Sequence, residues 1–452
     1  MSTSPRVLIN SLEAFQCQGG GISHFSKTLI KALGVDTDLD ILVDSRTNNS
    51  HKLLQYSSLF SVRTGANSRV FQGLNYFTNR FNPLGVRPIN LTKAPEDDNL
   101  LPLCIKRLGI KSAFSSEERS KLVRFFGGNN IKIKSETQFS TKTKLTSLKL
   151  KLSKEEKSNI VFHNPYPCPI HVQGVKNIIT IHDLIGITHP ELCLSDPGRE
   201  YELIKLLISK YDHIHFISDY AANITYQIFG PALQEKSSVV SQPILELPNQ
   251  FANSFEGHIK RRRELYGRFR SSGEGYIIQV GTLEPKKNHM TSIEAFLILK
   301  RTFPNLRLVV VGKEGWLCDN TVRRLSSLSN NGIEWLDYAS RELLIHLISN
   351  ALAFVFPSIV EGWGLPPVEA LALGTPAVVS NIPPCQQACQ KAAIYIDNYL
   401  DPFSWSKKLT HLLETENLYL EQAIKGIELG QLQSPEQYQN KLHKMYQKVL
   451  EA

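Results

Sequence analysis

The stretch Ala353–Ala370, AFVFPSIVEGWGLPPVEA, joins a short apolar run to a helical pattern through a glycine-rich turn. Ala353–Phe356 has the all-apolar composition of a strand that is buried on both faces, as strands of parallel sheets are. Pro366 suits the first turn of a helix, where a missing backbone N–H has no partner to lose. A buried strand that leads directly into a helix is the repeating unit of parallel α/β sheets.

The alternation of strand and helix extends from this stretch in both directions. In the second half we predict strands at Tyr276–Val280, Leu306–Val311, Ile333–Leu336 and Ala377–Val379, and helices at His289–Phe303, Asp319–Ser329, Arg341–Asn350 and Pro366–Leu373. In the first half we predict strands at Arg6–Asn10, Ile41–Val43, Asn159–Phe162, Asn177–Ile181 and His213–Ile217, and a helix at Ile22–Leu33. The sequence therefore predicts an α/β protein of two Rossmann-like domains in tandem, with a cleft between them.

Changes in composition divide the chain into domains. Irregular, polar and basic sequence over 246–275 predicts a linker between a first domain, 1–245, and a second domain, 276–433. Residues around 51–158 are rich in Asn, Ser, Thr and Lys and predict an irregular insertion. A capping sequence that begins at Ser434 predicts a last helix, 434–452, with an apolar stripe.

Length and composition exclude several classes of protein. The chain has 452 residues, which corresponds to two or three domains. Its hydrophobic share of 42% and charged share of 21% exclude long disorder. No apolar run approaches the roughly 18 to 20 residues of a membrane span, and no secretory leader precedes the first strand. The seven scattered cysteines indicate reduced thiols in a cytosolic protein, without a disulfide framework or a zinc site.

The positive charge is concentrated in one segment. Residues 101–160 hold fourteen Lys or Arg and five Glu, so this segment carries +9, which is the formal net charge of the whole chain. A basic segment beside a neutral body indicates an anionic partner, such as a membrane surface, a lipid-diphosphate acceptor or nucleic acid. The alternative is a solvated insertion without a partner.

Polar and glycine residues follow several predicted strands, at the edge where parallel sheets bind ligands. Gly20 and Gly21 precede the first helix and would let a ligand approach the backbone, although a flexible loop explains them equally well. Lys286 and Lys287 lie just before a helix N-terminus, where two cations are unfavourable unless an anion lies between them. The alternative is a pair of solvated lysines.

Two carboxylates flank the turn of the deciding stretch. Glu361 and Glu369 lie eight positions apart, with Gly364 and Leu365 between them at the start of the helix. Exposed amides at a helix start bind anions, and carboxylates accept hydrogen bonds from sugar hydroxyls. His182 ends a strand of the first half, where it would contact a ligand across the cleft, although a lone His is more often structural. The acidic cluster Asp36–Asp40 is interpreted as turn capping rather than as a metal site.

These motifs resemble retaining glycosyltransferase family 4, the glycosyl transferases group 1. The segments that carry the resemblance are Gly281–Asn288, Glu361–Glu369 and Ala370–Pro376, supported by Gly20–Ile22, His182–Asp183, Val311–Trp316 and Phe356–Ser358. The resemblance covers the second half almost continuously and the first half in patches. It implies the GT-B fold, with two Rossmann-like domains that face each other across a deep cleft, and a C-terminal helix that packs back on the first domain.

The resemblance implies a binding site for the diphosphate of a nucleotide sugar. Lys287 resembles the lysine that neutralises the diphosphate, and Gly364 and Leu365 resemble the amides that hold the distal phosphate. Thr282 stands where many members have an arginine, so this chain would rely more on Lys287 and backbone amides. Gly20 and Gly21 are assigned to donor binding as well.

The remaining roles are implied in the same way. Glu361 resembles the carboxylate that contacts the donor sugar, and Glu369 resembles the one that binds ribose. His182 is similar to the His near the reacting face of the sugar, and Tyr338 lies where the family holds the nucleobase. The segment 385–391 departs from the family pattern. Glu361, His182 and Lys287 are therefore the expected catalytic residues.

The implied function is the transfer of a hexosyl group, with retained configuration and without a metal, from a nucleoside diphosphate sugar to a glycan or lipid-linked acceptor. Gly312–Trp316 resembles mannosyltransferases most. We expect a role in cell-surface polysaccharide or glycoconjugate synthesis, in the cytoplasm and at the inner face of the membrane, with residues 101–160 contacting anionic lipid. One alternative is a catalytically inactive partner subunit that binds nucleotide sugar. A nucleic-acid-binding role is the other, and it lacks a recognisable module.

Overall fold

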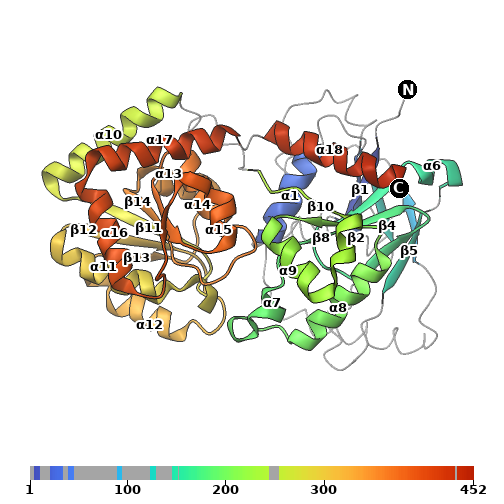
Figure 1. Cartoon of the computed structure of the whole chain (residues 1–452), viewed down its shortest axis with the longest axis horizontal. Helices are drawn as coiled ribbons and strands as arrows, with labels where there is room; N and C mark the ends of the chain where they lie inside the picture. Colours follow the sequence, from blue (N-terminus) through green and yellow to red (C-terminus); the bar gives the residue numbers. More distant parts are fainter. Residues whose placement is uncertain are drawn as a thin grey trace, which may run out of the picture.

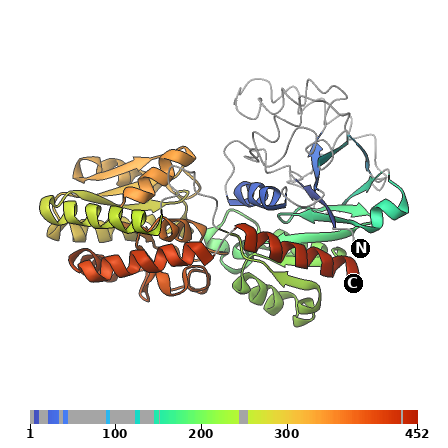
Figure 2. The ribbon, with the colours of Figure 1, turned by 90° about the horizontal axis from the view of Figure 1, so that it is seen from above.

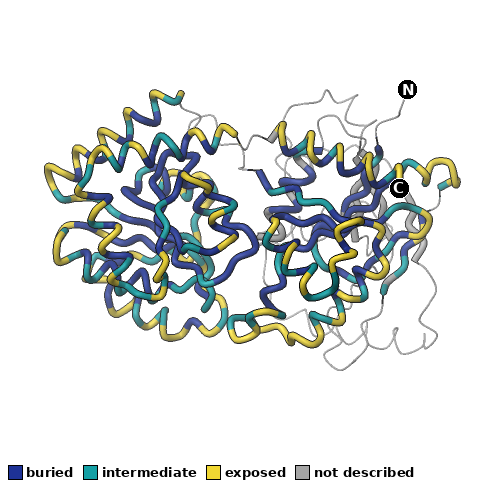
Figure 3. The backbone as a smooth tube through the Cα atoms, viewed as in Figure 1, coloured by how far each residue is buried: buried dark blue, intermediate teal, exposed yellow. Residues whose placement is uncertain are grey.

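The computed structural model describes residues 5–10, 21–33, 39–44, 89–93, 123–128, 145–150, 152–243, 254–432 and 435–452. These residues form two lobes, each with a sheet at its centre and helices around it (Figure 1). Buried residues are concentrated in the central strands of both lobes, and exposed residues line the outer helices (Figure 3). The α/β class and the two parallel sheets predicted from the sequence are confirmed.

The first domain is built on a ten-stranded sheet in the described ranges, with the order β10-β9-β8-β6-β1-β2-β4-β3-β5-β7. All neighbouring strands are parallel except β3 and β4. The strands are β1 (Arg6–Asn10), β2 (Leu39–Asp44), β3 (Ile89–Lys93), β4 (Val123–Gly128), β5 (Thr146–Leu150), β6 (Ile160–Asn164), β7 (Ile170–Gln173), β8 (Lys176–Ile181), β9 (His213–Phe216) and β10 (Ser237–Val239). The helices are α1 (Gly21–Leu33), α6 (Lys154–Ser158), α7 (Ile185–Thr188), α8 (Pro197–Lys210) and α9 (Asp219–Phe229).

The second domain has a parallel sheet with the order β13-β12-β11-β14-β15-β16. Its strands are β11 (Gly275–Val280), β12 (Leu306–Val311), β13 (Ile333–Leu336), β14 (Ala353–Phe356), β15 (Ala377–Ser380) and β16 (Ile394–Ile396). Its helices are α10 (Phe255–Ser272), α11 (His289–Thr302), α12 (Asp319–Ser327), α13 (Arg341–Asn350), α14 (Leu365–Ala372), α15 (Pro383–Cys389), α16 (Pro402–Glu414) and α17 (Glu416–Leu432). The deciding stretch is thus β14, a turn and α14.

The last helix, α18 (Pro435–Glu451), lies along the first domain rather than the second (Figure 2). It packs against α1 and β6. Its apolar stripe, from Tyr438 to Val449, is buried. The Tyr446 hydroxyl also donates to His163 Nδ1 in β6 at 2.7 Å.

Two parts of the chain differ from the sequence prediction. The linker predicted over 246–275 is largely helical, because α10 occupies 255–272 and buries one side, including Arg262, against the second domain. The insertion predicted as irregular over 51–158 contains β3, β4 and β5. These strands are too short for a periodic pattern of apolar residues to be recognised in the sequence. The predicted cap at Ser434 lies outside the described residues.

None of the helices in the described ranges combines the length and the apolar composition that crossing a membrane requires.

Candidate functional site

The candidate site lies at the switch point of the second sheet. β11 and β14 are neighbours, and the chain leaves them in opposite directions, to β12 and β13 on one side and to β15 and β16 on the other. Loops that follow such a pair of strands diverge and leave a crevice at the carboxyl edge of the sheet. The loop after β11 holds Lys286 and Lys287, and the loop after β14 holds Glu361.

Lys287 and Glu361 form a buried ion pair that joins these two loops. Lys287 Nζ donates to Glu361 Oε1 at 2.5 Å. The two side chains are only 14% and 10% exposed, so little water screens the pair. Neither loop alone brings these charges together, because the residues are 74 positions apart. The site therefore holds a fixed cation and a fixed carboxylate in direct contact.

The protonation of Glu361 depends on this pairing. Burial alone would raise the pKa of the Glu361 carboxyl, but the charges of Lys287 and Lys286 outweigh burial and lower it. Burial likewise opposes the charge of Lys286, whose pKa is nevertheless raised by Glu361, Asp183 and Glu284. At neutral pH both shifts favour an ionised Glu361 carboxylate and a charged Lys286 ammonium.

The backbone around Lys287 fixes the position of its side chain. Its aliphatic part lies over Gly281, where a Cβ would be 3.5 Å from Cδ, and its ammonium lies 5.2 Å from the centre of the Phe356 ring. Gln279 Nε2 donates to the Lys287 carbonyl at 3.0 Å. Lys287 ends a short 3₁₀ turn, Pro285–Lys287, directly before α11. These contacts hold the ammonium at the carboxyl edge of β11 and β14.

The start of α14 lies next to this pair in the sequence. Gly364 is the N-cap of α14 and has φ +120°, a left-handed conformation that favours glycine. Leu365 is the first helical residue, and no side chain in the described part of the chain caps the helix. The first amides of a helix have no partner inside it. Gly364 and Leu365, both predicted as anion-binding positions, thus begin a helix on the same loop as Glu361.

Glu369 pairs with a residue that the sequence analysis did not single out. Arg341 Nη2 donates to Glu369 Oε1 at 2.7 Å and Nη1 donates to Oε2 at 3.1 Å, which is a bidentate pair. Arg341 begins α13, just after the carboxyl end of β13. The sequence shows that Arg341 follows a predicted strand, which could have marked it as a candidate site residue. The sequence does not show that Arg341 pairs with Glu369. Tyr338 precedes it in the same loop and is 69% exposed.

The remaining predicted positions lie around the same edge or in the first domain. Thr282 follows β11, and its methyl group closely approaches Gly315, where a Cβ would lie 2.8 Å away. Gly312 likewise leaves room for the Gly281 carbonyl. Gly21 is the first residue of α1, and Gly20 lies outside the described residues.

His182 brings the first domain to the site. Its Nε2–H donates to the Pro165 carbonyl at 2.7 Å, which leaves Nδ1 without that proton. Burial lowers the pKa of His182. The backbone of His182 reaches the second domain, because a Cβ on Gly362 would lie 2.4 Å from the His182 carbonyl oxygen. His182 thus lies directly against the loop that carries Glu361.

Two further residues of the first domain's edge were missed. Ser218 Oγ donates to the Gly362 carbonyl at 2.7 Å, and Asp219 pairs with Gln387 of α15. The only sequence signal for Ser218 is its N-cap position before α9, which gives no partner in another domain. Within the described ranges, no three His, Cys, Asp or Glu side chains are grouped so that they could hold a metal ion.

The comparisons with known proteins agree with this architecture. Residues 265–428 match the family model described as Glycosyl transferases group 1. Among curated proteins, the serotype-specific mannosyltransferase WbdA of Escherichia coli is 26% identical over 232 residues, which cover 49% of this chain and 28% of the relative. The O-antigen chain mannosyltransferase B of Escherichia coli is 27% identical over 263 residues, 56% of this chain and 65% of the relative. The chain thus spans less than two thirds of the length of these relatives.

Solved structures share the fold over nearly the whole chain. Anabaena HepE, solved in complex with UDP and glucose, superposes with a TM-score of 0.59 at 11% identity and covers 98% of this chain and 100% of its own. Sucrose-phosphate synthase from Thermosynechococcus elongatus gives a TM-score of 0.57 at 14% identity, with coverages of 98% and 99%. At these identities the similarity shows the fold, and that fold is GT-B, as the sequence predicted.

Proposed function

We propose that this chain, whose residues 265–428 match the glycosyl transferases group 1 model, is a member of that family and transfers a hexosyl group from a nucleoside diphosphate sugar to an acceptor hydroxyl, with retained configuration. The observation that carries the proposal is the buried Lys287–Glu361 pair, which joins the loop after β11 to the loop that leads into α14. A cation, a carboxylate and free helix amides at one sheet edge suit a ligand that is anionic at one end and rich in hydroxyls at the other.

The leaving diphosphate is the group that most needs stabilisation. When its bond to the sugar breaks, negative charge develops on the diphosphate oxygens. The Lys287 ammonium and the amides at Gly364 and Leu365 supply fixed positive potential there, and a preorganised site stabilises the transition state without rearranging. Thr282, in the same loop as Lys287, offers only a hydroxyl and its backbone amide.

Glu361, Glu369 and His182 contact the parts of the donor that carry hydroxyl groups. Glu361 accepts hydrogen bonds from the sugar. Glu369 accepts hydrogen bonds from the ribose hydroxyls, either after Arg341 has moved away or while Arg341 still donates to one of its oxygens. Tyr338, exposed after β13, borders the space for the nucleobase. His182 faces the reacting side of the sugar from the first domain, where its backbone already touches Gly362.

The proposed reaction balances without a metal ion. The bond between the anomeric carbon and the diphosphate oxygen breaks, and the acceptor oxygen forms the new bond on the same face. The acceptor proton moves to the leaving diphosphate oxygen. The sugar passes through a cation-like state, as in glycoside hydrolysis. Contact between the two domains excludes water, which otherwise competes with the acceptor.

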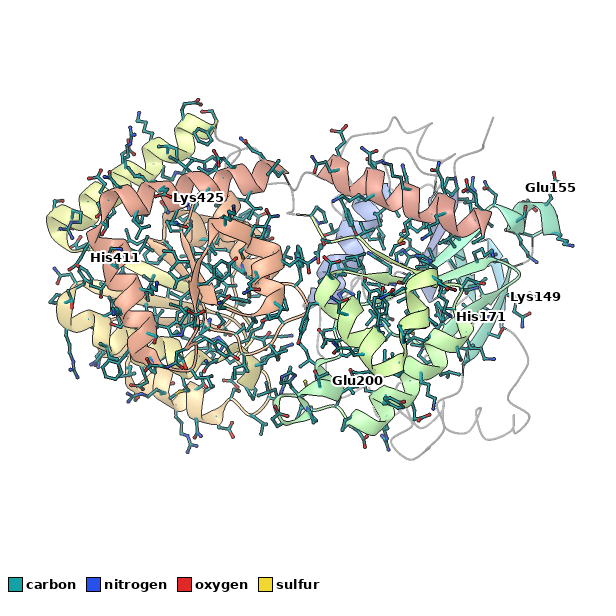
Figure 4. The ribbon with its side chains drawn as sticks, in the orientation of Figure 1. Lys149, Glu155, His171, Glu200, His411 and Lys425 are labelled. Carbon is teal, nitrogen blue, oxygen red and sulfur yellow. The ribbon has the colours of Figure 1, made fainter. Side chains whose placement is uncertain are left out.

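Mannose is the favoured sugar, and a glycan or lipid-linked molecule the favoured acceptor. Two of the curated relatives are named a serotype-specific mannosyltransferase and an O-antigen chain mannosyltransferase, which supports this choice. We further propose a cytoplasmic protein at the inner membrane face, with residues 101–160 contacting anionic lipid. Of this segment, Lys149 and Glu155 lie at the end of the first domain that is remote from the second (Figure 4). Lipid contact there would leave the cleft accessible.

A screen of nucleotide sugars tests the proposal. A true donor raises the melting temperature by mass action, and the same donor must then support transfer or slow hydrolysis. Stabilisation by a nucleoside diphosphate mannose, lost in Lys287→Ala, is the expected result. Stabilisation without any turnover would favour the inactive partner subunit. No stabilisation by any nucleotide sugar would contradict the proposal.

A further inference from the structure

Ser218 joins the two domains through a single hydroxyl group. Its side chain is fully buried and lies at the N-cap of α9. Oγ accepts the Ala221 N–H at 3.0 Å and donates to the Gly362 carbonyl at 2.7 Å. A hydroxyl has one proton, so the bond to Gly362 uses its only donor. The start of a first-domain helix is thereby bonded to the second-domain loop that carries Glu361.

Gly362 is held from a second side as well. A Cβ at this position would lie 2.4 Å from the His182 carbonyl oxygen and 3.1 Å from Asp183 Cβ. Such distances leave no room for a side chain, so only glycine permits this approach. The peptide between Glu361 and Trp363 is therefore confined between Ser218 and the end of β8.

Gln387 adds a second polar contact at the same helix start. The Asp219 N–H donates to Gln387 Oε1 at 2.9 Å, and Gln387 Nε2 donates to Asp219 Oδ2 at 2.5 Å. The amide thus satisfies both the backbone and the carboxylate of one residue. Gln387 belongs to the segment 385–391, which departs from the family pattern. This departure places an amide where the two domains meet.

We propose that the hydrogen bonds of Ser218 to Gly362 and of Gln387 to Asp219 together form a closing contact between the two domains, and that this contact positions Glu361 for transfer. Ser218 acts through the Gly362 carbonyl, because fixing this peptide fixes the direction of the preceding Glu361 side chain. Gln387 acts by holding the start of α9, where Ser218 lies, against the second domain. Ser218 and Gln387 are positioning residues, because neither lies among the donor-binding groups. The proposal rests on the proposed function and extends it: the first domain supplies part of the geometry of the donor site.

Three variants of Ser218 separate this role from helix capping. Ser218→Asp keeps an N-cap acceptor but cannot donate to the Gly362 carbonyl, and its charge repels that oxygen. Ser218→Thr keeps both functions. Ser218→Ala loses both, and Ser254→Ala, which removes the N-cap of α10, is its control. We expect Ser218→Asp to lower kcat for transfer at least about tenfold, with the donor Kd changed less than about threefold and Ser218→Thr near wild type.

Gln387 has a matched control in the same helix. Gln387→Glu places a carboxylate against Asp219 and should lower kcat as Ser218→Asp does. Gln386→Glu changes a residue that bonds Asn381 within the second domain and should leave kcat unchanged. Equal effects of the two glutamate variants would overturn the proposal, as would a full-rate Ser218→Asp.

Small-angle X-ray scattering measures how compact the protein is and so tests domain closure independently of transfer activity. The wild type should be more compact than Ser218→Asp, with the larger difference when nucleoside diphosphate is bound. Identical scattering of the two proteins would refute the closing contact even if transfer is observed. If instead the scattering differs and no nucleotide sugar binds or reacts, the closing contact holds and the proposed function fails.

Discussion

At the scale of single residues, Lys287 makes the largest charge contribution to the ionisation of Glu361, ahead of Lys286. Lys287 holds the charge of Glu361 at a position where burial would otherwise favour the neutral acid. A buried carboxylate that loses its partner becomes protonated or draws in water. Both the binding of a diphosphate and the ionisation of Glu361 should therefore fail together when this lysine is removed.

Lys287→Ala and Glu369→Ala should each abolish transfer while the protein stays folded. For Lys287→Ala we expect kcat/KM to fall by at least about 100-fold, since it removes the main cation facing the leaving group. Circular dichroism and steady-state kinetics on purified variants measure both effects. Near-normal turnover in both variants would show that the site is assigned wrongly.

The Lys287–Glu361 pair also makes stability depend on pH. The folded-state pKa of Glu361 lies below its unfolded value, so the pair stabilises the protein at neutral pH. This stabilisation is complete above the unfolded pKa, about 4.3, and is lost as pH falls through the folded pKa. Urea unfolding should show that the gap between wild type and Lys287→Ala is largest near pH 7 and narrows below about pH 4.

Lys425→Ala is the control for this pH effect. Lys425 pairs with Glu421 at 2.6 Å on α17, where both side chains are well exposed. Exposed pairs of this kind contribute little. The free energy of unfolding of Lys425→Ala should follow that of the wild type across the same pH range. If Lys425→Ala lost as much stability as Lys287→Ala, the buried pair would have no special role.

At the scale of elements, α10 shows how a polar sequence becomes part of a core. Arg262 is fully buried, and its guanidinium donates to the Ser349, Ala351 and Leu373 carbonyls and to Thr375 Oγ1. These acceptors lie at the ends of α13 and α14. A planar group with several donors can satisfy them at once, which an ammonium cannot. Arg262 therefore fixes α14, and with it the candidate site, to the first helix of the second domain.

Arg262→Ala should destabilise the protein by about 3 kcal/mol or more, because it leaves several buried carbonyls without donors. Arg262→Lys should recover part of this loss. Arg263→Ala, at the exposed neighbouring position, should lie within about 0.5 kcal/mol of wild type. Chemical denaturation gives all three values, and similar losses for Arg262→Ala and Arg263→Ala would contradict the assignment.

At the scale of the whole molecule, the last helix returns to the first domain. Its Tyr446 hydroxyl donates to His163 Nδ1, and His163 Nε2 donates to Thr180 Oγ1 at 2.8 Å. Thr180 then donates to His215 Nδ1 at 3.0 Å, and His215 Nε2 donates to the Val240 carbonyl at 2.9 Å. Because the Val240 carbonyl can only accept, every hydrogen bond in this buried series is donated in the direction of Val240. α18 is thereby connected through β6, β8 and β9 to the residue that follows β10.

Tyr446→Phe should destabilise the protein by about 1–3 kcal/mol, because His163 would keep a buried acceptor without a donor. Tyr438→Phe is the matched control in the same helix. Tyr438 is also buried, but its hydroxyl has no partner in the described part of the chain. Its removal should be neutral or stabilising. Equal losses in the two variants would show that the hydrogen bond to His163 contributes nothing.

The sequence by itself determined the class of fold and singled out the candidate site residues of the second domain. Buried strands such as Ala353–Phe356 and the helices between them are encoded locally, because side-chain periodicity and turn residues act over a few positions. Lys287, Glu361, Gly364 and Glu369 were recognisable for the same reason, since they follow strands of a parallel sheet. The strands β3, β4 and β5 are too short to carry a clear signal of this kind and were missed.

Only the tertiary structure decided which distant groups meet. Arg341 pairs with Glu369, Arg262 lies inside a core, and Ser218 bonds Gly362 from 144 positions away. Each of these contacts depends on strand order and on how the two domains meet, which no local pattern specifies. Their energies come from desolvated partners at fixed distances, and those distances exist only once the whole chain has folded.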